Sequence, residues 1–367
     1  MPSTDVLFSP FRLKSLSLPN RIVMAPMTRS KSPGQVPDET VAAYYRRRAE
    51  GGVGLIITEG TSPEHHSASY DVNIPAFFGD AALRGWANVV KGVKDAGGHI
   101  MPQLWHQGAL RRAGTGPYPQ APVMSPSGLS HPGKQVGEPM TQRDIDAVIA
   151  GFAASAGYAK TLGFDGVEIH GAHGYLIDQF LWEGTNQRSD AYGGSLEKRA
   201  RFAVEIVEAM RRAVGPQFPI VLRFSQWKLQ DYAARLVQAP EELERFLAPL
   251  TAAGVDVYHC STRRFWEAEF PQTGSDLNLA GWTKKISGCP TIAVGSVGLD
   301  DDFMAFRQKG ARTAGIERLL ELLNRGDFDL VALGRALIVN ADWPNKVRAG
   351  RFDRLAAYDP KSLETLV

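Results

Sequence analysis

The segment His170-Gly171-Ala172-His173-Gly174-Tyr175 gathers two imidazoles and one phenol within six residues. Two histidines at this spacing can act as metal ligands, as core histidines with satisfied hydrogen bonds, or as paired donors to one oxygen atom of a substrate. A metal would need further ligands from carboxylates or other histidines, and Glu59 and His106 are candidates. We favour paired donors, because two histidines stand beside a tyrosine and small spacer residues.

Glycines follow the last two apolar runs of the chain. Gly295 and Ser296 come after the run 291–294, and Gly334 and Arg335 come after the run 329–333. Backbone N–H groups beside glycine approach an anion closely, and the last two loops of an α/β barrel often bind phosphate. Glycines also end many strands that bind nothing, but the two loops together predict a phosphate site that includes the guanidinium of Arg335.

The type of phosphate ligand is narrowed by motifs that the sequence lacks. It has neither a G-x-G-x-x-G fingerprint after a strand nor a G-x-x-x-x-G-K-[ST] loop, so neither a Rossmann domain nor a P-loop is supported and a mononucleotide fits better. Arg223 lies in an apolar run, where a charge is costly unless it meets an anion. It either pairs with Glu59 or Glu168 or faces a ring that becomes negative on reduction.

The elements that must position these residues follow a repeated pattern, in which a short apolar run, a polar turn and a stretch of helical periodicity succeed one another. This alternation predicts an α/β chain folded as a (β/α)8 TIM barrel, with its chemistry at the strand ends. We expect the strands at Ile22–Met27, Leu55–Glu59, His99–Trp105, Gly166–His170, Ile220–Phe224, Val255–Cys260, Thr291–Val294 and Asp329–Leu333.

Helix signals lie between these strands. Ser195 is a plausible N-cap for a helix with an apolar stripe from Leu196 to Val214, and Gly215 marks its end. Thr141 starts another helix that should end before Gly163. We expect these helices to pack outside the sheet.

Three segments depart from the alternation. Residues 107–140 are rich in Gly, Pro and Ser and should form a long cap or lid excursion after the third strand. Residues 5–18 should form an N-terminal hairpin that plugs the barrel bottom, and residues 350–367 a tail with one helical turn. We therefore predict one domain over residues 1–367.

The composition excludes several classes of protein. The chain is 44% hydrophobic and 22% charged, with a formal net charge of only +2, so neither nucleic acid nor a membrane is an expected partner. Cys260 and Cys289 show no metal-ligand spacing and do not suggest a disulfide framework. No signal segment or membrane span is evident, and we expect a soluble cytoplasmic protein of unassigned oligomeric state.

The chain resembles the old yellow enzyme family of flavin-dependent ene-reductases over essentially its whole length. The order and spacing of the matching motifs together make the resemblance specific. These motifs are Asn20-Arg21-Ile22 with Ala25-Pro26-Met27-Thr28-Arg29, Gln103-Leu104-Trp105-His106, His170 to Leu176, Asn186-x-Arg188-x-Asp190-x-Tyr192-Gly193-Gly194-Ser195, and the loops at Gly295 and Gly334-Arg335.

The resemblance implies a tightly but non-covalently bound FMN with NAD(P)H as reductant. It places the Thr28 hydroxyl near the flavin O4 and Arg223 near N1 and O2. It implies that His170 and His173 bind the carbonyl or nitro oxygen of an activated alkene, and that Tyr175 supplies the proton. The cofactor residues it implies are Ala25, Pro26, Met27, Thr28, Gly60, Gln103, His170, Arg223, Gly295, Ser296, Gly334 and Arg335.

Aromatic residues near the strand ends are candidate walls of the substrate pocket, although aromatics also fill cores. We expect Tyr70, Trp105 and Trp266 in this role. The pair Arg263-Arg264 has no family role, and we expect it near the phosphates of the nicotinamide nucleotide. Position 28 is Thr where one branch of the family has Cys, so we expect no thiol near the flavin. The alternatives are another FMN barrel oxidoreductase and a metal-dependent barrel hydrolase that uses His170 and His173.

Overall fold

Eight parallel strands close into a barrel in the computed structural model of the chain, which describes residues 3–302 and 307–367. The strands are hydrogen-bonded in the order β10-β11-β12-β3-β4-β5-β8-β9, so the predicted (β/α)8 barrel is confirmed. Their bounds are β3 Ile22–Met24, β4 Leu55–Thr61, β5 Ile100–Leu104, β8 Val167–His170, β9 Ile220–Ser225, β10 Val257–Ser261, β11 Thr291–Val294 and β12 Leu330–Leu333.

Two strand ends differ from the prediction in ways that matter for the site. β3 ends at Met24, three residues before the predicted end, because Pro26 has no N–H group to continue the ladder. β10 runs one residue further than predicted and includes Ser261, which pairs with Ser225 of β9 and Val294 of β11.

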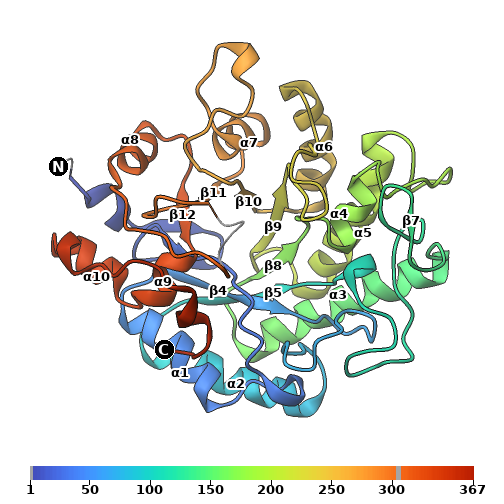
Figure 1. Ribbon diagram of the computed structural model, residues 1–367, viewed down its shortest axis with the longest axis horizontal. Helices are drawn as coiled ribbons and strands as arrows, with labels where there is room; N and C mark the ends of the chain where they lie inside the picture. The colour runs from blue at the N-terminus through green and yellow to red at the C-terminus, as the bar shows by residue number, and fades with distance from the viewer. Residues whose placement is uncertain (1–2, 303–306) are drawn as a thin grey trace.

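Helices form a ring around the strands (Figure 1). The predicted caps are confirmed: the Ser195 hydroxyl accepts from the Lys198 N–H, Thr141 and Asp144 form a capping box, and Gly163 ends its helix with a φ of 84°. The helices are α1 Glu39–Glu50, α2 Asp80–Asp95, α3 Gln142–Leu162, α4 Leu176–Leu181, α5 Leu196–Val214, α6 Pro240–Ala253, α7 Leu279–Ser287, α8 Glu317–Arg325, α9 Arg335–Val339 and α10 Trp343–Arg348.

An antiparallel hairpin of β1 (Phe11–Leu13) and β2 (Leu16–Leu18) closes the end of the barrel where the strands begin. Phe11, Leu16 and Leu18 are buried in one apolar cluster with the residues that the strands point inward at this end. The predicted plug is confirmed for residues 11–18, whereas Asp5–Phe8 of the predicted hairpin forms a 3-10 helix. The strand residues of the cluster include Val23, Leu55, Ile57, Met101, Val221, Val257, Ile292, Leu330 and Ala332.

The excursion after β5 is an ordered loop that carries a short hairpin, β6 (Leu129–His131) with β7 (Lys134–Gln135). The buried Arg111 holds it together, because its guanidinium donates to the backbone carbonyls of Thr115, Tyr118 and Ala121. The C-terminal tail contains two short 3-10 turns, and the second, Pro360–Leu363, contacts α9. Figure 1 shows the C-terminus beside α9.

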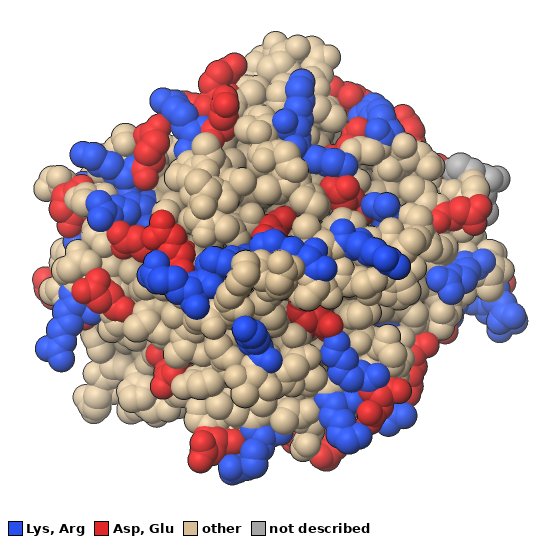
Figure 2. Space-filling model, turned by 180° about the vertical axis from the view of Figure 1, so that it is seen from behind, with Lys and Arg blue, Asp and Glu red and all other residues tan. Residues whose placement is uncertain are grey.

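The surface seen from behind carries intermixed acidic and basic side chains, with a band of basic ones across its middle (Figure 2). Among the described helices, none is long and apolar enough to cross a membrane.

Candidate active site

A cavity of about 520 Å³ lies where the barrel strands end. The structure brings nearly all of the predicted site residues to its walls, because the carboxyl ends of parallel strands meet at one end of a barrel. The predicted residues that line it are Ala25, Pro26, Met27, Thr28, Tyr70, Gln103, Trp105, His170, His173, Tyr175, Arg223, Gly295, Ser296, Gly334 and Arg335.

Two of the predicted site residues do not line this cavity. Trp266 does not line the cavity, since its side chain is 37% exposed and packs edge-on against Phe265 with ring centroids 5.1 Å apart. Gly60 does not line the cavity either. A Cβ atom at position 60 would lie 2.5 Å from the Trp105 ring, so glycine here gives Trp105 the space to pack against the backbone of β4.

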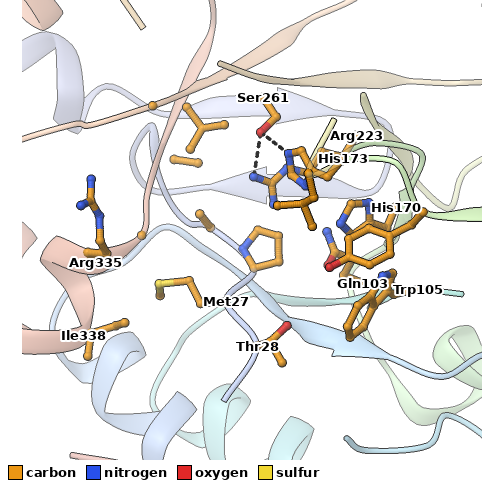
Figure 3. Close-up of a pocket in the computed structure, with 18 of the residues that line it drawn as sticks. Met27, Thr28, Gln103, Trp105, His170, His173, Arg223, Ser261, Arg335 and Ile338 are labelled. Atoms are coloured by element: carbon orange, nitrogen blue, oxygen red, sulfur yellow. Dashed lines mark hydrogen bonds between the residues drawn. The ribbon is translucent and has the colours of Figure 1, made fainter. Parts of the chain in front are cut away.

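Two groups of residues face each other across the cavity (Figure 3). One end carries the polar and aromatic side chains of Gln103, Trp105, His170, His173 and Arg223, and the other end carries Met27, Ile338 and Arg335. The cavity therefore has a hydrogen-bonding end and an end that combines apolar side chains with a guanidinium.

His170 keeps one ring nitrogen free to donate. Its Nδ1 accepts the backbone N–H of Ala172 at 3.3 Å, so the proton of the neutral ring is on Nε2. Burial is the main cause that lowers the pKa of His170 well below its ordinary value, and the charge of Arg223 lowers it further. The ring is therefore neutral near pH 7 and presents one N–H donor.

His173 is oriented by Ser261 and Arg223. The Ser261 hydroxyl accepts from Arg223 at 3.1 Å and lies 2.8 Å from Nε2 of His173, and we assign its remaining proton to that nitrogen (Figure 3). The proton of the neutral His173 ring is then on Nδ1. Burial, followed by Arg223, lowers the pKa of His173 well below 6.5. The two rings lie 5.1 Å apart and nearly perpendicular, and each has one N–H left.

Tyr175 begins the turn into α4 and packs edge-on against two rings, Trp105 at 4.9 Å and His170 at 5.1 Å. Burial raises the pKa of its hydroxyl, so the phenol stays protonated through the neutral range. Within residues 3–302 and 307–367, no hydrogen-bond partner of this hydroxyl is found. Tyr175 therefore places an uncommitted O–H donor in the cavity.

A buried ion pair fixes the segment that carries His173 and Tyr175. Nζ of Lys228 lies 2.6 Å from Oδ1 of Asp178, and both side chains are fully buried. The other carboxylate oxygen accepts the N–H of Gly174 at 2.7 Å, and the backbone of Leu229 donates to the His173 carbonyl. Because β9 and α4 are tied together here, the backbone of His173 is held at its positive φ of 64°.

The buried cation Arg223 has no carboxylate within ion-pair distance in the part of the chain that the structure describes; its guanidinium donates to Ser261 and its Nε is unpartnered. The two predicted partners are engaged elsewhere. Glu59 accepts the backbone N–H groups of Arg29 and Ser30, and Glu168 binds Gln103 and His259. A buried, incompletely bonded cation in the cavity wall suits a ligand that carries negative charge.

The loops after β11 and β12 line the other end of the cavity. Gly295 has a φ of 147°, and a Cβ there would lie 2.7 Å from the carbonyl oxygen of Thr262, so this backbone position excludes side chains. The guanidinium of Arg335 is held by the carbonyls of Asp301 and Asp302, at 2.6 and 2.8 Å. The glycine backbone and the guanidinium fit the phosphate of a mononucleotide, and the buried Arg223 fits the ring at the far end.

Several lining residues were missed by the sequence analysis. Trp227 stacks on His173 with ring centroids 4.4 Å apart, and Ser261 bridges His173 and Arg223. Both residues follow closely on the predicted strands Ile220–Phe224 and Val255–Cys260, and this position is the sequence signal that marks them. Ile338 and Leu363 also line the cavity, and no local pattern marks them. Arg263, which we expected near the phosphates of the nicotinamide nucleotide, is a lining residue as well.

The alternative of a metal-dependent hydrolase requires a set of metal ligands. In the described chain, no three His, Cys, Asp or Glu side chains lie close enough to hold an ion. His106 does not join His170 and His173. Its Nε2 lies 3.1 Å from Nδ1 of His65, outside the cavity lining.

Comparison with known families identifies one match over almost the whole chain. Residues 6–354 match the model of the NADH:flavin oxidoreductase / NADH oxidase family. A flavin oxidoreductase of Emericella nidulans, hxnT, is 32% identical over 96% of this chain and 94% of its own length. The 12-oxophytodienoate reductase 2 of Arabidopsis thaliana is 31% identical over 93% of this chain and 87% of its own.

Another relative is longer. The NADH oxidase of Thermoanaerobacter brockii is 35% identical over 94% of this chain, which spans only 51% of that protein. Among solved structures, morphinone reductase in complex with tetrahydroNAD matches with a TM-score of 0.81 and 30% identity, over 97% of this chain and 93% of the other.

Proposed function

Since the chain belongs to the NADH:flavin oxidoreductase / NADH oxidase family, that of old yellow enzyme, and is an FMN-dependent oxidoreductase with NAD(P)H as reductant, we propose that it reduces activated carbon–carbon double bonds. The observation that carries the proposal is the set of three uncommitted donors in one cavity. His170 and His173 each have one N–H left, and the hydroxyl of Tyr175 has no partner among the described residues. The substrates would be enones, maleimides or nitroalkenes.

The two histidines would bind the carbonyl or nitro oxygen of the substrate. As neutral rings they donate hydrogen bonds without adding charge, and they are pre-oriented by the Ala172 N–H and the Ser261 hydroxyl. Donors fixed in a buried site stabilise the negative charge that develops on this oxygen. The β-carbon of the alkene then becomes electron-poor.

Tyr175 would act as the general acid. Its phenol is protonated at neutral pH, and the edge-on packing against Trp105 and His170 holds its O–H in the cavity. A positioned acid of this kind transfers its proton to the α-carbon as the β-carbon is reduced.

The residues that would hold FMN lie at the two ends of the cavity. Gly295, Ser296, Gly334 and Arg335 would bind the phosphate, and Gln103, Arg223 and Thr28 the polar edge of the ring. FMN held there would supply the hydride transfer between NAD(P)H and the alkene. Trp227 and Tyr70 would enclose the substrate.

The experiment separates the two half-reactions. The protein is reduced with NADH or NADPH without oxygen and then mixed with 2-cyclohexenone, N-phenylmaleimide or a nitroalkene in a stopped-flow spectrometer. We expect the oxidised flavin spectrum to return as the alkene is consumed. If no activated alkene reoxidises the flavin, the proposed function is wrong although FMN is bound.

A further inference from the structure

A buried carboxylate lies directly behind the polar end of the cavity. Glu168 of β8 is fully buried; its Oε1 accepts from Nε2 of Gln103 at 2.8 Å, and its Oε2 lies 2.6 Å from Nδ1 of His259. Gln103 lines the cavity, whereas Glu168 and His259 do not. Neither of these two residues takes part in the proposed binding of substrate or transfer of a proton.

The barrel places this pair one layer below the reacting groups. Side chains two residues apart along a strand point the same way. Glu168 therefore points inward beneath His170 on β8, and His259 points inward beneath Ser261 on β10. The strand between them is β9, where Arg223 is in register with both His170 and His259. The pair thus underlies the wall formed by Arg223 and Gln103.

Hydrogen bonding fixes which atoms this wall presents. The amide of Gln103 must turn its nitrogen to Glu168, because the reverse orientation would set a carbonyl oxygen against a carboxylate. Its carbonyl oxygen is then left to face the cavity. His259 has its pKa lowered by burial above all, so the ring is neutral and donates from Nδ1 to Glu168. Both oxygens of Glu168 therefore receive a donor.

The cluster combines a carboxylate with a guanidinium. Both oxygens of the Glu168 carboxylate face a donor, which is the arrangement that suits an acceptor-only carboxylate, and no ion pair joins it to Arg223 within 4.0 Å in the described chain. Its field still reaches Arg223: burial lowers the pKa of the guanidinium and the Glu168 charge opposes that shift. An arginine remains protonated in a protein. The wall therefore combines one positive charge at the cavity with one negative charge behind it.

We propose that Glu168 is a buried counter-charge to Arg223, held by Gln103 and His259, that weakens the preference of the site for reduced over oxidised FMN. The inference rests on the proposed placement of the FMN ring against Gln103 and Arg223. Reduction adds negative charge to the ring, and a lone guanidinium would stabilise that charge strongly. Glu168 offsets part of this stabilisation, so the bound cofactor stays a stronger hydride donor. Glu168 and His259 are positioning residues and touch neither cofactor nor substrate.

The test compares the affinities for oxidised and reduced FMN, with no alkene present. In Glu168→Gln, reduced FMN should gain about tenfold in affinity relative to oxidised FMN. For a two-electron couple this is a shift of about +30 mV in the midpoint potential, which a redox-dye titration measures. A merely structural role would weaken both affinities equally and leave the potential unchanged, and that result would overturn the inference, as would a negative shift.

A matched control and a second pair of variants distinguish a change in charge from a loss of folding. Glu269 accepts an amide hydrogen bond from Gln226 at 2.9 Å outside the cavity, so Glu269→Gln should leave the potential unchanged. His259→Leu removes one of the two donors that hold the Glu168 carboxylate, so its potential should lie between that of the wild type and that of Glu168→Gln. His259→Asn restores an N–H donor and should return the potential to the wild-type value.

The outcomes keep this inference separate from the proposed function. A positive shift in Glu168→Gln with no alkene reduced would refute the ene-reductase proposal and leave the counter-charge in place. If the wild type reduces alkenes but the potential of Glu168→Gln is unchanged, the ene-reductase proposal stands and the counter-charge proposal is refuted. A potential of His259→Leu equal to that of the wild type would contradict the role of His259 in holding Glu168.

Discussion

Replacing Tyr175 by Phe tests the proposed acid with little disturbance of the fold. The substitution removes one oxygen atom and keeps the ring that packs against Trp105 and His170. Because no described residue bonds to the hydroxyl, its loss leaves no buried donor or acceptor unsatisfied. We therefore expect a melting temperature close to that of the wild type.

The expected kinetic effect follows from the role of the proton. A positioned general acid contributes roughly 10²- to 10⁴-fold to a rate, which is about 2.7–5.4 kcal/mol at 1.36 kcal/mol per factor of ten. Reoxidation of the reduced protein by 2-cyclohexenone should slow by this factor in Tyr175→Phe. Reduction of the flavin by NAD(P)H needs no proton from Tyr175 and should change by less than about threefold.

Stopped-flow absorbance measures both half-reactions on the same preparation. In the wild type the alkene half-reaction should also be independent of pH through the neutral range, because burial raises the pKa of Tyr175 and keeps it protonated there. Equal slowing of both half-reactions would refute the assignment of Tyr175 as the acid. So would full activity of the Phe variant toward the alkene.

Three further predictions concern the surroundings of the reacting groups. Asp178→Asn leaves the fully buried Lys228 without its counter-charge and should lower the free energy of unfolding by roughly 3–5 kcal/mol; an unchanged urea midpoint would contradict this. Arg335→Ala should weaken FMN binding by about 10- to 100-fold, since a charged hydrogen bond contributes about 1.5–3 kcal/mol, and should leave riboflavin binding almost unchanged; fluorescence titration with both ligands distinguishes the two. Below pH 6.5 histidines of the unfolded chain bind protons, whereas the buried histidines of the folded chain stay neutral. The urea midpoint should therefore decrease as the pH is lowered from 7.5 to 5. A midpoint that increased would show the pKa directions to be wrong. The histidines concerned are His65, His106, His170, His173 and His259.

The barrel was predictable because its signals are local. Each strand is a short apolar run, buried in the closed sheet, and caps such as Thr141 and Ser195 mark the helix starts in the sequence itself. The order of these elements then places every strand end at one rim, which is why residues as distant as Thr28 and Arg335 could be assigned to one cavity. The early end of β3 could also have been foreseen, from Pro26.

The less predictable part of the site depends on side-chain direction and on contacts between distant segments. Trp266 and Trp227 are both aromatic and both follow a barrel strand, yet only Trp227 turns inward to stack on His173. No motif in the sequence marks Ser261, and only the structure shows that its hydroxyl lies between His173 and Arg223. Leu363 reaches the cavity from the end of a short 3-10 turn in the C-terminal tail, and nothing in the sequence shows that this turn folds back over the barrel. Such assignments need the packed structure.

The pairing of β12 with β3 has a consequence for how the protein is made. Val331, Ala332 and Leu333 hydrogen-bond in register with Ile22, Val23 and Met24, so the last barrel strand joins the first. During synthesis the earlier strands leave the ribosome with an unpaired edge, which invites contact with other chains. The cavity also takes Thr28 from one side of this seam and Gly334 from the other. Binding of the cofactor therefore requires that β12 has been synthesised and has paired with β3, and a ligand that spans the seam would favour the closed barrel over the unfolded chain by mass action.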